Sequence, residues 1–321
     1  MAEIIEPIEK YGLSAKDKTK SLFSRIGVVG CGQEGRTIVN LTALSGMEVV
    51  FIEVSQDRID YALKAIENGL DTQIQNWGLT QGEKRATMGR IKGSMDYNDL
   101  KGCDFVIECI RYEVNGEKST GLRKEVFTKL ENILAPDAII ATNATTVIIS
   151  ELAADLQHQD RCISLHFPIF HSDARLLEIA KGTFTSEEVA KKIELFAKMI
   201  KFTPVRVHES SGMVNMRLMA VMLNEACEIL MEGVSSLEDI DKQFTISFGQ
   251  RLGIFEMADL FGIEKAVMLM EDMFDDYGDR KYKANPILWR LYRSKQHGVK
   301  TRRGFYTYDE QGNKLGVNDL I

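Results

Sequence analysis

The hydrophobic pattern in the first two thirds of the chain alternates between short β-branched runs and stretches with helical spacing. An apolar run at 26–29 is followed by a glycine-rich turn, a helical stretch that ends near Gly46, and a second apolar run at 48–52. Similar runs lie at 105–110, 138–142, 162–166 and 204–207. Strands that alternate with helices predict an α/β fold of Rossmann type, a doubly wound and mostly parallel sheet with helices on both faces.

The pattern changes after Gly212, where long helical periodicities at 213–230 and 255–274 replace the strands. We therefore expect helices alone in the last third of the chain. Thr185 and Glu188 have the spacing of a capping box and predict the start of a helix at 187–200. The predicted parts are an N-terminal extension at 1–21, a Rossmann domain at 22–207 and an all-α C-terminal domain at 208–321.

Composition limits the classes of function. The chain has 321 residues, of which 44% are hydrophobic, and this is enough for two domains with a core each. The net charge of -7 comes without a block of lysine or arginine, so no nucleic acid is expected as a partner. No apolar run approaches the roughly 20 residues of a membrane span, and we expect a cytoplasmic protein. The five cysteines lack metal-ligand spacing, and no metal is predicted.

The first glycine-rich turn is the most specific chemical motif. Gly30, Gly32 and Gly35 form the pattern G-x-G-x-x-G between a strand and a helix. In a dinucleotide-binding βαβ unit, the first glycine permits a tight turn and the second lets backbone N–H groups approach a pyrophosphate. The third glycine permits close packing of helix and strand. Gln33 and Glu34 begin the helix, whose positive N-terminus would face the phosphates.

An acidic residue, Glu53, closes the second strand. It is placed to accept hydrogen bonds from an adenosine ribose, and a carboxylate there disfavours a 2′-phosphate, so NAD is expected instead of NADP. The alternative is an ordinary βα turn without a ligand, because glycines also gather in turns. The flanking strands and the closing acid favour the cofactor site.

Five histidines are candidates for a catalytic base. His166 leads because it lies at the carboxyl end of a predicted strand, where doubly wound sheets bind ligands. A neutral imidazole can remove a hydroxyl proton near physiological pH, and Glu178 could orient the ring through its far nitrogen. The alternative is a histidine with a purely structural hydrogen bond. Weaker cases, in polar loops or at helix ends, are His158, His171, His208 and His297.

Taken together, the motifs occur in the order found in L-3-hydroxyacyl-CoA dehydrogenases, and the chain resembles that family from about Arg25 to Tyr308. The shared pieces are Gly30-x-Gly32-x-x-Gly35, Val106-Ile-Glu108-Cys-Ile, Thr142-Asn143-Ala-Thr145-Thr146, Leu165-His166-Phe167 with Leu177-Glu178, Asn224-Glu225-Ala226, Phe255-Glu256-x-x-Asp259 and Lys300-Thr-Arg-Arg-Gly304-Phe305-Tyr306. Any one of them would be weak, whereas the set is specific. The resemblance implies a nucleotide-binding domain followed by a helical domain that forms a homodimer interface, with substrate in the cleft between the domains.

The resemblance also implies roles for individual residues. His166 would be the catalytic base with Glu178 as its orienting partner. Thr145 would replace a serine whose hydroxyl contacts substrate and nicotinamide. On the cofactor side, the matching positions are Glu113, which stands one residue late in its loop, Arg123, which replaces a lysine, and Lys300, for which a solvated surface charge is the alternative.

Three positions depart from the family pattern. Met216 stands where the family has an asparagine, and Asn215 is one position early. Because one residue turns a helical side chain by about 100°, Asn215 can replace that amide only if the helix start is re-registered. The sequence Pro168-Ile169-Phe170 replaces Phe-Asn-Pro and removes another amide near the cofactor. Asn76 and Gly69 align with a lysine and a serine that bind coenzyme A phosphates, so a CoA ester would have fewer contacts.

The leading hypothesis is the NAD-dependent oxidation of a short-chain L-3-hydroxyacyl-CoA to the 3-oxoacyl-CoA, as in fatty-acid or butyrate metabolism. The weaker CoA contacts favour an alternative, a dehydrogenase of a small free 3-hydroxy acid or polyol on the same scaffold. Met216 and Ile169 favour a third possibility, a non-catalytic NAD-binding homologue. The intact pair of His166 and Glu178 counts against that third possibility.

Overall fold

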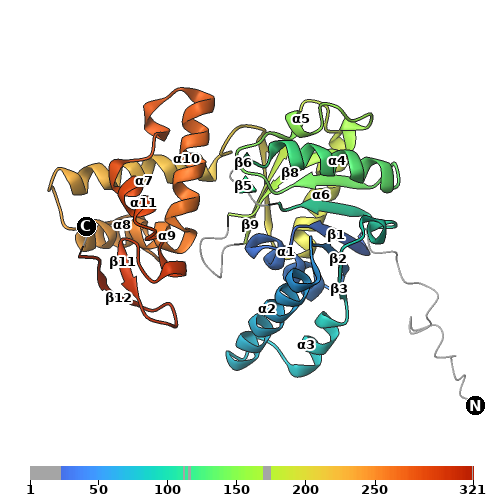
Figure 1. Cartoon of the computed structure of the whole chain (residues 1–321), viewed down its shortest axis with the longest axis horizontal. Coiled ribbons are helices and arrows are strands. Elements are labelled where there is room, and N and C mark those ends of the chain that lie inside the picture. Colours follow the sequence, from blue (N-terminus) through green and yellow to red (C-terminus); the bar gives the residue numbers. More distant parts are fainter. Residues whose placement is uncertain (1–22, 111–112, 115–116, 169–174, 320) are drawn as a thin grey trace, which may run out of the picture. The chain divides into compact units, whose positions relative to one another are not determined.

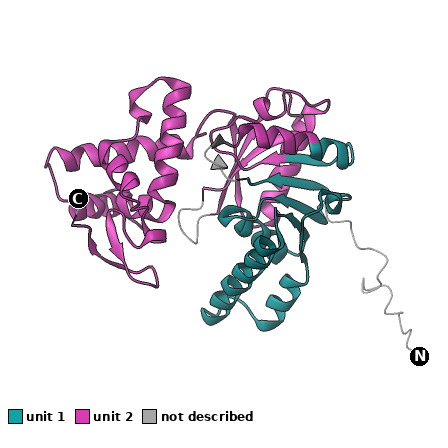
Figure 2. Ribbon diagram, in the orientation of Figure 1, with its two compact units in different colours: residues 1–111, 129–140 teal, residues 112–128, 141–321 magenta. Residues whose placement is uncertain are grey.

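The computed structural model of the chain describes residues 23–110, 113–114, 117–168, 175–319 and 321 (Figure 1). For residues 113, 114, 117 and 118 the description covers the backbone alone. The expected extension at 1–21 therefore lies outside the described residues. The chain divides into two compact units, residues 1–111 with 129–140 and residues 112–128 with 141–321 (Figure 2).

The described residues form an eight-stranded sheet in the hydrogen-bonded order β10-β9-β8-β7-β4-β1-β2-β3. Its strands are β1 (Arg25–Val29), β2 (Glu48–Ile52), β3 (Ile91–Ser94), β4 (Phe105–Glu108), β7 (Ile139–Thr142), β8 (Cys162–His166), β9 (Leu176–Lys181) and β10 (Thr203–His208). β1 pairs in parallel with β2 and β4, as β2 does with β3 and β9 with β10, whereas β8 and β9 are antiparallel. The predicted mostly parallel sheet is confirmed. The sequence pattern did not predict β3 and β9.

Local sequence explains the elements of the first unit. Continuous apolar runs such as Val49–Ile52 suit strands of a parallel sheet, because helices cover both faces of such sheets. The helices that begin in this unit are α1 (Gln33–Leu44), α2 (Gln56–Gln75) and α3 (Gln81–Met88). Ser55 caps α2 by accepting a hydrogen bond from the backbone N–H of Arg58. Thr80 and Glu83 form a capping box at the start of α3.

The second unit begins with a short hairpin and continues through the remaining sheet strands. This part of the chain contains β5 (Glu113–Val114), β6 (Glu117–Lys118), α5 (Ile149–Leu152) and α6 (Glu187–Met199). It also contains the start of α4 (Thr120–Ile133), whose residues 129–133 belong to the first unit. The predicted capping box of α6 is wrong by one residue, because the N-cap is Ser186, whose hydroxyl accepts from the Val189 N–H. Thr185 instead donates to the Cys162 carbonyl at 2.6 Å and accepts from the Gly182 N–H. Its hydroxyl therefore joins the loop to β8.

The C-terminal region of the second unit is helical, as predicted. It comprises α7 (Asn215–Met231), α8 (Leu237–Phe248), α9 (Ile254–Phe261), α10 (Ile263–Tyr277) and α11 (Pro286–Arg293). Its core includes Leu223, Phe255, Leu288 and Phe305, each 1% exposed or less. Two expectations are corrected by the structure. The helical pattern at 255–274 is two helices, because Gly262 with φ of 101° ends α9. Strands also recur after position 212, since β11 (Tyr306–Tyr308) pairs with β12 (Lys314–Val317).

Among the helices of the described residues, none combines the length and the hydropathy that crossing a membrane would require.

Candidate active site

The glycine-rich turn of the first unit has the geometry that a dinucleotide site needs. Gly30 has φ of 90°, and a Cβ there would lie 2.8 Å from the Cys109 carbonyl oxygen. A Cβ at Gly35 would lie 2.1 Å from the carbonyl oxygen of Gly30, so only glycine permits this packing of α1 against the turn. At Gly32, by contrast, a Cβ would meet no described atom within 4 Å. The second glycine thus faces open space, where a pyrophosphate can approach the backbone.

The start of α1 and the end of β2 complete this cradle. α1 begins at Gln33, and its N-cap Gly32 provides no side-chain cap for the first N–H groups. Glu53 is 9% exposed, and its Oε1 accepts a hydrogen bond from the Cys31 N–H at 2.8 Å. The carboxylate therefore lies against the turn itself, where it can receive a ribose hydroxyl. Gln33 and Glu34 are exposed at the helix start. These residues fit NAD.

The second unit holds a buried imidazole–carboxylate pair. His166 and Glu178 are 6% and 2% exposed, and His166 Nδ1 lies 2.7 Å from Glu178 Oε2. The antiparallel pairing of β8 and β9 sets these two residues directly opposite each other. Since an ionised carboxylate only accepts hydrogen bonds, the proton of a neutral His166 resides on Nδ1, and Nε2 keeps its lone pair. The carboxylate thus holds the imidazole in one tautomer.

Backbone groups at the start of α7 fix the other oxygen of Glu178. Its Oε1 accepts from the N–H groups of Val214 at 3.2 Å and Asn215 at 3.0 Å. N–H groups at a helix start have no partner within the helix, and the carboxylate satisfies two of them. Sequence reasoning missed this contact, although the glycine before an apolar helical stretch marks where such N–H groups occur. Glu178 thus joins the helical region to the sheet.

Thr145 and Asn215 lie next to this network. Gly212, with φ of 78°, donates its N–H to the Thr145 carbonyl at 2.9 Å, so the loop after β7 is bonded to the turn before α7. The Asn215 side-chain oxygen is buried and finds no hydrogen-bond partner among the described residues. Met216 is 1% exposed and packs into the interior. Of the adjacent residues Asn215 and Met216, only Asn215 has a polar side chain that could bind a ligand.

The remaining predicted residues occupy different surroundings. Arg123 is 5% exposed, and its guanidinium donates to Ser119 at 3.0 Å and Thr142 at 3.4 Å. It thereby lies at the end of β7. Lys300 is on the surface, with a side chain 78% exposed and its Nζ 3.7 Å from the Glu264 carboxylate. The side chain of Glu113 and the residues 169–174, which include His171, lie outside the described residues.

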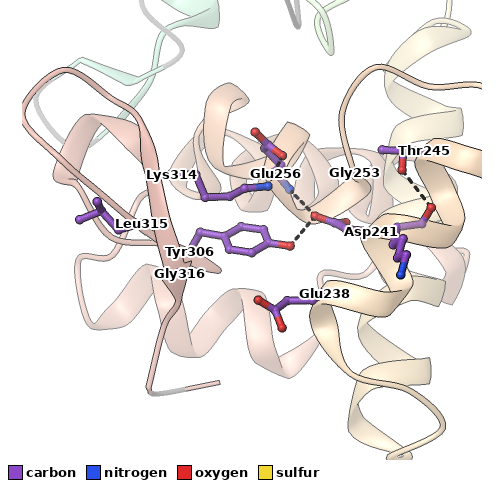
Figure 3. Close-up of a pocket in the computed structure, with 10 residues that line it drawn as sticks. Glu238, Asp241, Thr245, Gly253, Glu256, Tyr306, Lys314, Leu315 and Gly316 are labelled. Atoms are coloured by element: carbon purple, nitrogen blue, oxygen red, sulfur yellow. Dashed lines mark hydrogen bonds and ion pairs between the residues drawn. The ribbon is translucent and has the colours of Figure 1, made fainter.

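Two hollows in the helical region have other chemistry. One, of about 380 Å³, is lined in part by Asp241, Glu256, Tyr306 and Lys314. Figure 3 shows Tyr306 and Asp241 pointing toward each other, and the phenol donates to Asp241 at 2.9 Å. Asp241 also accepts from the Phe255 N–H, and burial raises the pKa of its carboxyl group. These contacts join α8, α9 and β11, so Asp241 stabilises the fold of this region.

The second hollow, of about 1100 Å³, lies between α7 and α11 and is lined in part by Asn224, Trp289, Arg290 and Arg293. Within the described part of the chain, no group of three or more histidine, cysteine or acidic residues could hold a metal ion.

The chain combines a doubly wound sheet, a glycine-rich turn and a buried histidine–glutamate pair with a helical region that follows in sequence. Together these features define a nucleotide-dependent dehydrogenase. Residues 25–210 match the NAD binding domain of 3-hydroxyacyl-CoA dehydrogenase, and residues 212–308 match its C-terminal domain. The chain belongs to the 3-hydroxyacyl-CoA dehydrogenase family. The predicted family, enzyme class and NAD cofactor are thereby confirmed.

Individual relatives agree with this assignment. A 3-hydroxybutyryl-CoA dehydrogenase of Clostridioides difficile is 30% identical, over 89% of this chain and all of that protein. The crystal structure of (S)-3-hydroxybutyryl-CoA dehydrogenase from Ralstonia eutropha is similar with a TM-score of 0.79 and 30% identity, covering 90% of this chain and 100% of the other. A diketoreductase, whose structure is described by its dual catalysis of dicarbonyl compounds, has a TM-score of 0.74 and 26% identity. That match covers 89% of this chain and 99% of the other.

Proposed function

We propose that the protein oxidises short-chain L-3-hydroxyacyl-CoA esters to 3-oxoacyl-CoA, with His166 as the general base. The observation that carries the proposal is the 2.7 Å contact between His166 Nδ1 and Glu178 Oε2. Two backbone N–H groups hold the Glu178 carboxylate in place. Short chains are proposed because similar proteins are 3-hydroxybutyryl-CoA dehydrogenases. A positioned base of this kind contributes about 10²- to 10⁴-fold in rate.

In the proposed mechanism, His166 Nε2 removes the hydroxyl proton of the substrate, and Glu178 stabilises the imidazolium through Nδ1–H. Bound NAD supplies the acceptor for the hydride from C3. The Thr145 hydroxyl donates to the developing carbonyl oxygen, where a fixed donor contributes about 3 kcal/mol. The Asn215 amide, whose oxygen is buried without a described partner, binds a polar group of the substrate.

We propose that NAD is bound by the glycine-rich turn, the helix start and Glu53 of the first unit, and by the three residues that match the family's cofactor positions. These residues are Gly30, Gly32, Gln33, Glu34, Gly35, Glu53, Glu113, Arg123 and Lys300. The homodimer is likewise a proposal and rests on the family. The division at 22–207 and 208–321 and a cytoplasmic location are proposals that rest on the hydrophobic pattern of the sequence.

A second candidate is a dehydrogenase of a small free 3-hydroxy acid or polyol on the same scaffold. Asn76, the exposed C-cap of α2, and Gly69 offer no cation at the two positions where the family resemblance expects contacts to CoA phosphates. The similarity to a diketoreductase supports this candidate. The remaining alternative is an NAD-binding homologue without catalysis.

The deciding experiment is NADH oxidation by the purified protein with acetoacetyl-CoA, free acetoacetate and a panel of 3-oxo acids. Rapid turnover of the CoA ester supports the leading proposal, and turnover of free acids alone supports the second. NADH binding without turnover of any substrate supports the non-catalytic alternative. His166→Ala tests the base directly: a loss of about tenfold or less would contradict its assignment. His158→Ala, in a polar loop, is the control and should retain full activity.

A further inference from the structure

One hydrogen bond of the second unit joins two side chains that are 126 residues apart in sequence. The Thr146 hydroxyl donates to Asp272 Oδ2 at 2.7 Å, and both residues are 7% exposed. Thr146 directly follows Thr145 in the loop after β7, and Asp272 belongs to α10. A carboxylate that loses its water is tolerated where protein donors replace it. The Thr146 hydroxyl is such a donor.

Asp272 is buried on α10, although Asp275 and Asp276, the next residues on the same helix face, are exposed. On its buried side it lies beside apolar residues: Leu269, one turn earlier, is 5% exposed, and the adjacent Met273 is fully buried. An apolar side chain would fill this position without the cost of removing a carboxylate from water. The choice of aspartate therefore indicates a hydrogen-bonding duty.

α10 supports the neighbouring turn at two more points. The Tyr277 hydroxyl donates to the Ser211 carbonyl at 2.9 Å. A Cβ at Gly212 would lie 2.2 Å from Met273 Sδ, which means that α10 packs directly against this glycine. Gly212 in turn donates its N–H to the Thr145 carbonyl at 2.9 Å. One helix thus contacts both the loop of Thr145 and the turn that leads to the N–H donors of Glu178.

We infer that Asp272 is a positioning residue for the reaction: by holding Thr146, it fixes the loop that presents the Thr145 hydroxyl to the substrate. The inference rests on the proposed function, in which that hydroxyl contacts the substrate oxygen. Asp272 itself touches no reacting atom and acts through Thr146. A shift of about 1 Å in such a donor can lower a rate by about 10²-fold. Six of the nine proposed cofactor contacts, including the glycine-rich turn, belong to the first unit, so cofactor affinity should stay nearly unchanged.

The test compares variants that remove the bond with variants that keep it. Thr146→Val and Asp272→Leu remove the donor and the acceptor, whereas Thr146→Ser and Asp272→Asn keep them. Asp276→Leu makes the matching change at an exposed position one turn later on α10. The readouts are kcat with the 3-oxo substrate that the wild type turns over, NADH affinity from fluorescence, and the melting temperature.

We expect Thr146→Val and Asp272→Leu each to lower kcat by about ten- to hundredfold with unchanged NADH affinity. Thr146→Ser and Asp272→Asn should restore most of the rate, and Asp276→Leu should match the wild type. The double variant Thr146→Val with Asp272→Leu should be no slower than the slower single variant, because both remove the same bond.

If Thr146→Val kept the wild-type kcat, the inference would be wrong while the proposed function would stand. The same holds if the kcat reductions of the two single variants multiplied in the double variant. If Asp272→Leu does not fold, the Thr146→Val and Thr146→Ser pair decides, because these variants leave α10 intact. A wild type that turns over no substrate would instead refute the proposed function, and the inference with it.

Discussion

Replacing Glu178 by glutamine tests the tautomer of His166 with almost no change of shape. The carboxylate accepts hydrogen bonds at both ends, from His166 at Oε2 and from the N–H groups of Val214 and Asn215 at Oε1. A glutamine side chain has one accepting oxygen and one donating NH₂ group, so it cannot accept at both ends. Either the backbone N–H groups or the imidazole must then face the NH₂ group.

The backbone N–H groups can only donate, whereas a neutral imidazole can exchange its donor and acceptor nitrogens. We therefore expect the glutamine oxygen to face α7 and its NH₂ group to donate to His166 Nδ1. The imidazole proton then resides on Nε2, which has no lone pair left for the substrate hydroxyl. The number of hydrogen bonds stays the same, so the melting temperature should change little.

The expected loss follows from the role of a general base, which is worth about 10² to 10⁴ in rate. We expect Glu178→Gln to lower kcat by about 10³-fold, because an amide beside a catalytic histidine of a hydrolytic triad costs about 10⁴-fold through the same change of tautomer. NADH affinity should match the wild type. Glu188→Gln, an exposed side chain on α6, is the control and should have full activity.

Two measurements test the reasoning separately. Steady-state kinetics with the 3-oxo substrate gives kcat, and ¹⁵N spectra of histidine-labelled protein report which nitrogen carries the proton. A variant that keeps more than about a tenth of the wild-type kcat would refute the assignment of the base. A variant whose His166 still carries its proton on Nδ1 would refute the tautomer argument even if activity were lost.

Three further predictions concern the cofactor turn and the helical region. Gly35→Ala should lower the melting temperature of the cofactor-free protein, since its Cβ would lie 2.1 Å from the Gly30 carbonyl oxygen. The Cβ of Gly32→Ala would lie in open space, so this variant should keep the wild-type melting temperature and only bind NADH more weakly. If both variants lowered the melting temperature equally, the prediction would be wrong. The wild type should bind NADH more tightly than NADPH, and Glu53→Gln should reduce this difference in affinity. Equal affinities of the wild type for NADH and NADPH would contradict the contact between Glu53 and the ribose. Burial raises the pKa of Asp259 to about 7. The folded state therefore holds a proton that the unfolded state lacks between about pH 4 and 7, and stability falls as pH rises through this window by at most about 1.4 kcal/mol per pH unit. Asp259→Asn should remove this part of the slope in melts between pH 5 and 8, and identical slopes would exclude Asp259 as its source.

Local patterns in the sequence predicted the first βαβ unit and its glycines, because the turn, the close packing and the closing acid depend on residues near one another in the chain. The same is true of the alternation of strands and helices. The error at the start of α6 has the same origin: Thr185 and Ser186 are both good N-caps, and only the bond from Thr185 to the Cys162 carbonyl in β8 decides between them.

Contacts between distant segments could not be predicted in this way. The run at 176–181 is apolar except for Glu178 and Lys181, and this pattern does not reveal that β9 runs antiparallel to β8. That register is what places Glu178 opposite His166. The bond from Thr146 to Asp272 spans 126 residues, and no periodicity in either segment indicates the other. Sequence motifs thus identified the candidate residues and the expected pairing of His166 with Glu178, whereas the antiparallel register behind that pair and the bond from Thr146 to Asp272 came from the structure.

The exchange of an asparagine for methionine at 216 is best understood from the backbone before α7. Gly212 and Met213 have φ of 78° and 46°, so the chain makes a left-handed turn that directs the next N–H groups to Glu178. Met216 then packs into the core, and the Asn215 oxygen is buried with no partner among the described residues. Such an oxygen costs free energy until a ligand supplies a donor. We therefore expect substrate to complete the hydrogen bonding of Asn215, which would keep an amide in the site one residue earlier than the family pattern places it.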